Sequence, residues 1–246
     1  MKRSYTAEIA KLAKVETFDP NAFTSEHKSV QACGDFVLAL ALAFNDLKDL
    51  LLVDSLLLGE VPQDRHTPSP ELGAFGGSHL HFLRVLFGVL RELLYLVKRE
   101  KVTYESSCFQ SVIRNLPKQR REAWQKLVDA SEADTSSDAD VRFLVIARNT
   151  VAYHYDRKGM GQGYRRAFTS SPEPPFLSRG SSISTTRFYF ADRAAQSYLQ
   201  HAFGQQDLEN YFLQNQRLIS DIAFALFSVV TGFINTRGFG WRQAAG

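Results

Sequence analysis

An arginine, an amide and a histidine lie close together in the second half of this 246-residue chain. Arg148, Asn149 and His154 fall within an otherwise apolar run. A guanidinium can hold a phosphate through its planar fork of N–H groups, and an imidazole can move a proton near neutral pH. These residue types would therefore suit a site that binds a phosphodiester and transfers a proton.

The apolar run predicts a helix from about Ser137 to about Tyr155, and Ser137 with Asp140 resembles a capping box at its start. On such a helix Arg148 lies at the centre of one apolar stripe, and His154 lies on the opposite side. The first stripe also contains Val141, Leu144, Val145, Val151, Ala152 and Tyr155, and the second contains Phe143, Ile146 and Thr150. A helix with two apolar sides is sandwiched, either within its own bundle or against a second chain.

An arginine in an apolar stripe needs an acceptor, because burying an unpaired guanidinium costs several kcal/mol. The expected acceptor for Arg148 is a carboxylate, such as Glu92 or Asp46, or else a phosphate. Residues six positions apart point about 120° away from each other on a straight helix. Arg148 and His154 can therefore act together only across a fold or a dimer. The alternative is a buried ion pair and a core histidine, with no site at all.

Arg148, the polar Asn149 directly after it, and five intervening residues before His154 resemble the motif of the HEPN superfamily. The resemblance covers roughly residues 30 to 157. It implies a helical-bundle homodimer that cleaves RNA without a metal or other cofactor, in a cleft between the two protomers. His154 would take the proton of a ribose 2′-hydroxyl, Arg148 would hold the scissile phosphate, and Asn149 would orient a neighbouring group.

The resemblance leaves two further points open. Many HEPN-like proteins are non-catalytic, so the alternative function is a helical interaction or dimerisation module, whose second apolar face on the motif helix is the interface. A protein partner, such as an antitoxin, is also compatible with the resemblance.

The segment after the motif is rich in Gly, Ser and Pro, and we expect about 158–190 to be a mobile basic loop. Its expected RNA-binding residues are Arg157, Lys158, Arg165 and Arg166, with Tyr164 among them. Positive charge interleaved with aromatic rings suits the binding of a single strand. The alternative is an ordinary solvated loop.

Helical periodicity dominates the rest of the chain. Apolar residues recur at three, four and seven positions over about 30–58, 79–99, 117–129 and 207–236, whereas 187–190 could form one short strand. We therefore predict a single all-α domain over 1–246, an up-and-down HEPN-like bundle with an additional long C-terminal helix.

Composition excludes several classes of protein. Cys33 and Cys108 are far apart in the sequence, which predicts neither a disulfide framework nor a zinc site. His79 and His81 would point in nearly opposite directions on a helix, so we expect no metal. The net charge of +3 is too small to indicate by itself that the protein binds nucleic acid.

Two apolar segments raise the question of a membrane. The segment 80–97 contains Arg84, Arg91 and Glu92, and the segment 218–234 contains Asp221. Because a spanning helix needs about 20 residues nearly free of charge, we expect both to be buried core helices of a cytoplasmic protein.

Overall fold

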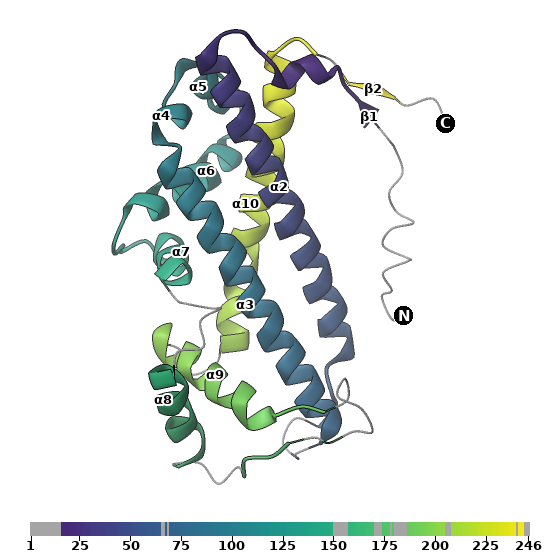
Figure 1. Cartoon of the computed structure of the whole chain (residues 1–246), viewed down its shortest axis with the longest axis vertical. Helices are drawn as coiled ribbons and strands as arrows, with labels where there is room; N and C mark the ends of the chain where they lie inside the picture. Colours follow the sequence, from purple (N-terminus) through teal and green to yellow (C-terminus); the bar gives the residue numbers. More distant parts are fainter. Residues whose placement is uncertain are drawn as a thin grey trace.

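A computed structural model of the chain describes residues 16–64, 67, 69–149, 157–169, 174–177, 179, 186–204, 208–239 and 241–243. The described part is an all-α helical bundle, which confirms the predicted fold class (Figure 1). Its α-helices are α2 (Lys28–Leu57), α3 (Pro70–Arg99), α4 (Lys101–Tyr104), α5 (Ser107–Arg114), α6 (Lys118–Glu132), α7 (Ala139–Asn149), α8 (Arg157–Phe168), α9 (Tyr189–Ala202) and α10 (Leu208–Thr236). Two 3₁₀ turns, Pro20–Phe23 and Leu58–Glu60, flank α2. The short strands β1 (Glu16–Thr17) and β2 (Arg242–Gln243) pair antiparallel, with Glu16 opposite Gln243.

Three long helices form the centre of the bundle. α2 and α3 run in opposite directions, α10 lies behind them, and α6 and α7 pack beside α3 (Figure 1). The apolar stripes of these helices meet in one continuous core, as their spacing predicts. Its fully buried side chains include Leu40, Leu47, Leu86, Leu90, Leu94, Leu127, Phe143 and Phe233.

Helix α10 accounts for the apolar segment near the C-terminus. By length and composition Tyr211–Thr236 could cross a membrane: an 18-residue window within it has a mean hydropathy of 1.8, and half of that window is buried inside the bundle. Ile219, Ile222 and Leu226 are among its fully buried residues. Packing on α2 and α6 thus explains much of its apolar composition.

Helix α3 begins nine residues before the predicted position. Ser69 caps it by accepting a hydrogen bond from the Leu72 backbone N–H at 3.1 Å, and Pro70 follows in the first turn. The predicted start at about residue 79 was therefore wrong, because three glycines between residues 73 and 77 disfavour a helix locally. Gly77 instead makes room for a neighbour, since a Cβ there would lie 1.7 Å from Nε of Arg187.

The segment about 158–190, predicted as a loop, instead includes most of one helix and the start of another. α8 occupies its beginning, and α9 starts at Tyr189, inside the predicted short strand 187–190. Small residues at every fourth position of α8, Gly159, Gly163 and Ala167, form its buried side. A Cβ at Gly163 would lie 2.1 Å from the carbonyl oxygen of Ala194 in α9. Close approach of the two helices therefore stabilises a segment whose local propensity is poor.

Candidate functional site

Arg148 lies at the end of α7, and its side chain is 6% exposed. Nη1 donates to the carbonyl oxygens of Ala130 and Ser131, each at 2.8 Å. Nη2 donates to the carbonyl oxygen of Ala133 at 2.7 Å. These carbonyls belong to the last turn of α6 and the residue after it, where helix carbonyls have no intrahelical partner. Arg148 therefore caps the C-terminus of α6 with a positive charge.

The acceptors of Arg148 are not the ones predicted. Nε donates to the side-chain oxygen of Asn149 at 3.3 Å, so four of the five N–H groups of the guanidinium are hydrogen-bonded within the chain. The carboxylate of Asp134 lies 3.9 Å from Nη2 and is fully exposed. Glu92 and Asp46, the predicted carboxylate partners, line a groove between α2 and α3 instead. With these hydrogen bonds in place, the guanidinium has few N–H groups left to bind a phosphate.

The two apolar sides of α7 are both covered within the chain. Val141, Leu144 and Val145 on the Arg148 side are at most 4% exposed. On the opposite side the ring of Phe143 packs against Phe87 of α3 and Tyr211 of α10, at centroid distances of 6.3 and 5.7 Å. Of the two alternatives for a sandwiched helix, the described part of α7 is thus sandwiched inside its own bundle.

The start of α7 also differs from the prediction. Asp138, not the pair Ser137 and Asp140, caps the helix, by accepting hydrogen bonds from the backbone N–H groups of Asp140 at 2.9 Å and Val141 at 3.0 Å. The bond from Val141 is the main cause that lowers the pKa of the Asp138 carboxyl below its usual value. Asp140 instead accepts a hydrogen bond from Lys126 in α6, which raises the pKa of that lysine.

The other predicted catalytic residues are placed only in part. Asn149 is exposed at the last position of α7. His154 lies outside the described residues, as do all residues from 150 to 156. Its relation to Arg148 remains a prediction from the sequence.

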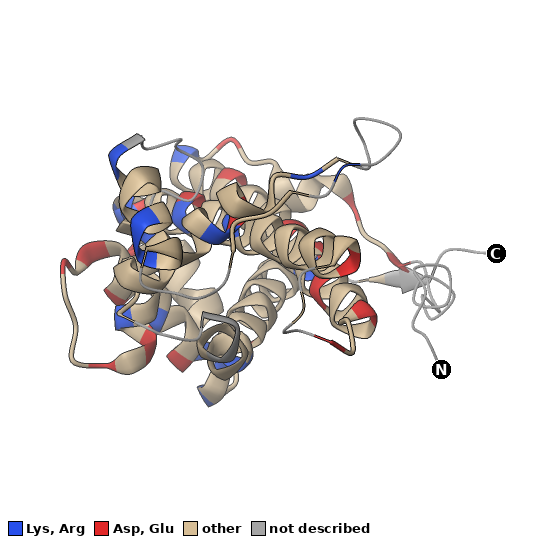
Figure 2. Cartoon of the chain, turned by 90° about the horizontal axis from the view of Figure 1, so that it is seen from below, with Lys and Arg blue, Asp and Glu red and all other residues tan. Residues whose placement is uncertain are grey.

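The predicted RNA-binding residues fall on α8. Lys158, Arg165 and Arg166 are exposed, and the ring of Tyr164 beside them is 38% exposed. Arg157 begins α8, and its side chain lies outside the described part. Figure 2, which views the molecule from below, shows several blue Lys and Arg segments gathered toward one side of this end. We call Lys158, Tyr164, Arg165 and Arg166 the basic face of α8.

This face concentrates the positive charge of the chain. α8 contains four Lys and Arg residues and no Asp or Glu, whereas the whole chain has a net charge of only +3. The remainder of the chain therefore has no excess of positive charge. Because Gly159, Gly163 and Ala167 occupy the side that faces α9, the side chains of Lys158, Arg165 and Arg166 project away from the bundle.

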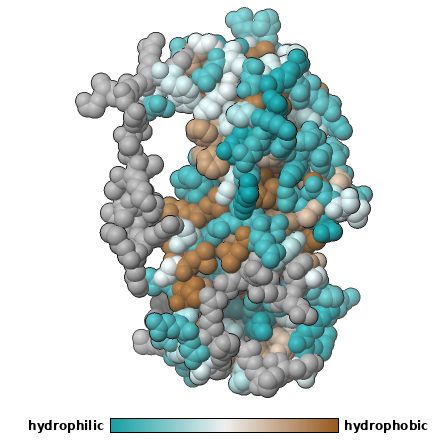
Figure 3. Space-filling model, turned by 180° about the vertical axis from the view of Figure 1, so that it is seen from behind, coloured by the Kyte–Doolittle hydropathy of each residue, from teal (hydrophilic) through white to brown (hydrophobic). Residues whose placement is uncertain are grey.

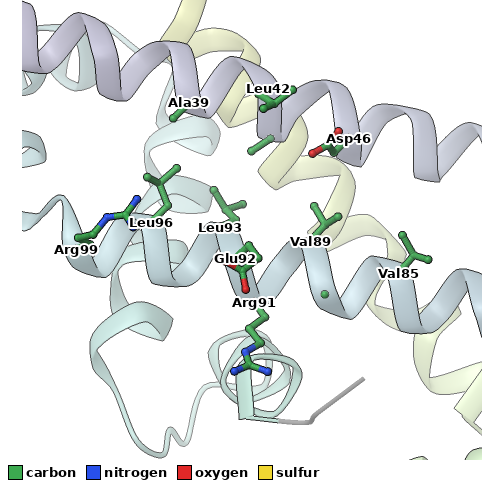
Figure 4. Close-up of a pocket in the computed structure, with 12 residues that line it drawn as sticks. Ala39, Leu42, Asp46, Val85, Val89, Arg91, Glu92, Leu93, Leu96 and Arg99 are labelled. Atoms are coloured by element: carbon green, nitrogen blue, oxygen red, sulfur yellow. The ribbon is translucent and has the colours of Figure 1, made fainter. Parts of the chain in front are cut away.

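An apolar groove of about 630 Å³ lies between α2 and α3 (Figure 4). Val85, Val89, Leu93 and Leu96 of α3 point toward α2, whereas Arg91 points away. Small residues from both helices, Ala39, Ala43 and Gly88, widen the groove. Leu42 at its edge is 63% exposed. Sequence reasoning missed this groove, although Leu38 and Leu42 lie four residues apart beside the main apolar stripe of α2.

A second apolar surface lies on the opposite side of the molecule. Figure 3 shows a band of hydrophobic residues across the back. α10 lies behind α2 in Figure 1, and among its described side chains three large apolar ones are 41–54% exposed: Leu213, Phe224 and Phe227. Phe227 contacts the ring of Phe44 in α2 at 5.7 Å, and Phe224 lies under the guanidinium of Arg120 at 4.6 Å. These contacts fix both rings against their neighbours.

A buried polar cluster joins the three central helices. Asp54 of α2 is fully buried, and one of its oxygens accepts a hydrogen bond from Gln216 of α10 at 2.9 Å. Its other oxygen lies 3.9 Å from Nε2 of His79 in α3, whose ring stacks between Phe75 and Phe82. Within the described residues, no group of three His, Cys, Asp or Glu side chains could hold a metal ion. The cluster fixes the relative positions of the helices.

Comparisons of the chain with protein families, with curated proteins and with solved structures gave no match.

Proposed function

We propose that this protein binds single-stranded RNA through the basic face of α8, as a helical binding protein of HEPN-like type. The observation that carries the proposal is the concentration of exposed positive side chains on α8, with Tyr164 among them. Positive side chains attract the phosphate backbone, and an exposed ring can stack on a base. No base-specific contact is needed for such binding.

Arg148 supports binding without touching RNA in this proposal. Its guanidinium is occupied by the α6 carbonyls, so it holds α6 and α7 together at the point where the chain leads into α8. A role as phosphate ligand would require those hydrogen bonds to break, which exposes buried carbonyl groups. Binding is therefore better supported than cleavage.

The test measures the fluorescence anisotropy of a labelled single-stranded RNA in excess EDTA. The double variant Arg165→Ala with Arg166→Ala should weaken binding at least about tenfold. The slope of the logarithm of the binding constant against the logarithm of the salt concentration should become less steep by about 1.4, which is about 0.7 for each lost phosphate contact. The matched control is Lys118→Ala with Arg217→Ala, which removes the same charge from side chains that are 83% and 87% exposed on α6 and α10. Equal losses in both variants, or no RNA binding by the wild type, would contradict the proposal.

The same preparation tests cleavage. Mixed RNA is incubated with the wild type and with His154→Ala in EDTA, and we expect intact RNA in both. Cleavage by the wild type that His154→Ala abolishes would overturn the non-catalytic role and establish the metal-independent ribonuclease that the motif implies. Arg148→Ala is informative here only after its folding has been verified.

A second candidate function, self-association, is favoured by the groove between α2 and α3. Leu42 is a prominent apolar side chain directly beside a recess of small residues, so Leu42 of each copy can enter the groove of the other. The rim also carries both signs of charge, Asp46 and Glu92 against Arg99. An isologous dimer needs such a self-complementary surface.

Sedimentation velocity tests this dimer. The wild type should sediment as a dimer and Leu42→Glu as a monomer. The control Val102→Glu changes a side chain that is 85% exposed on α4, away from the groove, and should remain dimeric. A monomeric wild type, or a dimeric Leu42→Glu variant, would exclude this interface.

A further inference from the structure

A row of aromatic side chains continues from the basic face of α8 onto the start of α9, the helix packed against it (Figure 1). The ring of Tyr164 on α8 contacts the ring of Phe190, with their centroids 6.5 Å apart. Phe190 in turn contacts Phe188, the residue directly before α9, at 5.7 Å. Phe188 is 58% exposed, more than any other aromatic side chain in the part of the chain that the structure describes. The row therefore begins among the arginines of α8 and ends on an open ring.

The residues on both sides of Phe188 are fixed, although its own ring is exposed. Before it, Nε of Arg187 pairs with the carboxylate of Asp192 at 2.7 Å. After it, the ring of Tyr189 stacks on Phe176, with the centroids 4.1 Å apart. A side chain that is positioned before binding loses less conformational entropy when a ligand contacts it. Phe188 thus presents its ring to solvent from a held backbone.

The surroundings of the aromatic row are positively charged. Residues 157–169 contain four Lys and Arg residues and residues 186–202 contain two, whereas Asp192 is the only carboxylate in either range. The charge of Asp192 is compensated by its ion pair with Arg187. Exposed rings alone would suit any apolar partner, but rings beside exposed cations suit a polyanion that carries flat bases.

We propose that Phe188 is a second base-stacking residue beside Tyr164, so that the site binds unpaired bases as well as phosphates. This inference rests on the proposed function and deepens it, because it names the ligand as a strand whose bases are free to stack. The phosphates contact Arg165 and Arg166, and the bases turn toward the aromatic row. In a duplex the bases are already stacked on one another, and unstacking them costs free energy. Phe188 therefore favours single strands over duplexes without reading the sequence.

The experiment measures the fluorescence anisotropy of three labelled probes: a single-stranded RNA of about 12 nucleotides, the same strand paired with its complement, and an abasic strand of equal length. Phe188→Ala should bind the single strand about fivefold or more weakly than the wild type, the loss expected for one stacked base. It should bind the duplex and the abasic strand as the wild type does, because neither offers a base to the ring. The matched control is Phe224→Ala, which removes a ring that is 54% exposed on α10 and should leave all three affinities unchanged.

Two further variants separate stacking from a structural role. Phe188→Trp retains a flat ring and should bind the single strand at least as tightly as the wild type. Phe188→Leu retains an apolar side chain without a ring and should lose affinity as Phe188→Ala does. Wild-type affinity in Phe188→Leu and Phe188→Ala, or an equal loss for the abasic strand, would overturn the stacking role.

The outcome also distinguishes this inference from the proposed function. If Arg165→Ala with Arg166→Ala weakens RNA binding while Phe188→Ala does not, the basic face binds RNA and the stacking role alone is wrong. A wild type that binds none of the probes would overturn both.

Discussion

Two regions of this protein contain arginines in opposite environments, one buried and one exposed to solvent. At the end of α7, Arg148 is 6% exposed and donates to three backbone carbonyl groups. On α8, Arg165 and Arg166 are exposed, and the buried side of the helix is made of small residues. A guanidinium already surrounded by acceptors stabilises the fold, whereas one that faces solvent remains available to a ligand.

The comparison shows that an arginine in an apolar stripe does not by itself indicate a ligand. The acceptors that Arg148 requires were available inside the chain, at the C-terminal end of α6. Helix ends always leave such carbonyl groups, and a long cationic side chain can satisfy several of them at once. In the proposed function, the role of binding RNA therefore falls to the exposed arginines of α8.

The largest expected effect follows from Arg148→Ala. We expect a loss of about 2–4 kcal/mol in the free energy of unfolding, because buried carbonyl oxygens lose their donors. Urea denaturation followed by circular dichroism measures it. Arg142→Ala is the control, since Arg142 is an exposed arginine on the same helix, and it should change stability by less than about 0.5 kcal/mol. Similar values for the two variants would remove the distinction between the buried and exposed arginines.

A smaller effect is expected from Gly163→Ala. The added methyl group would lie 2.1 Å from the Ala194 carbonyl oxygen, so α8 must move away from α9. We expect a loss of about 1–3 kcal/mol and weaker RNA binding, since the basic face shifts with its helix.

Gly161→Ala is the matched control for that variant. Its nearest neighbour would be Nη1 of Arg165 at 3.5 Å, an ordinary contact. Alanine there should be neutral or stabilise α8 by up to about 1 kcal/mol, because glycine is a poor helix former. If thermal denaturation shows equal losses for both variants, close packing of α8 on α9 is not what holds the basic face in place.

The smallest effect concerns the cap at the start of α7. The hydrogen bonds from Val141 and Asp140 lower the pKa of Asp138 below its unfolded value of 3.8. Its contribution to stability is therefore complete above pH 3.8 and is lost as the pH falls through the lower, folded value. Asp138→Asn retains an acceptor and should cost less than about 1 kcal/mol at pH 7.

The pH dependence distinguishes charge from hydrogen bonding at this cap. The difference in stability between the wild type and Asp138→Asn should shrink as the pH falls below 4, because the wild-type carboxyl becomes neutral as well. A difference that stays constant from pH 7 to pH 3 would mean that the charge of Asp138 contributes nothing.

Helix prediction from the sequence succeeded where a helix carries its own apolar stripe. The ends of α2 and α10 agree with the predicted ranges 30–58 and 207–236 to within two residues. The start of α3 and the whole of α8 were missed because their glycines argue against a helix locally. Those glycines are explained by neighbours remote in sequence, Arg187 against Gly77 and Ala194 against Gly163.

The candidate site was predicted in part. Lys158, Arg165 and Arg166 were identified by residue type, and the spacing of Gly159, Gly163 and Ala167 would have been the signal that they lie on one exposed side of a helix. The groove at Leu42 needs two helices to form, so no single segment could reveal it.

The sequence by itself determined that this chain is a helical bundle and which residue types it offers for chemistry, because periodicity and charge are properties of each segment alone. Only the tertiary structure decided the surroundings of those residues. It brought the last carbonyls of α6 to Arg148 and left the basic face of α8 in solvent. Each of these outcomes depends on which groups from distant segments meet, and that is decided when the apolar stripes pack together.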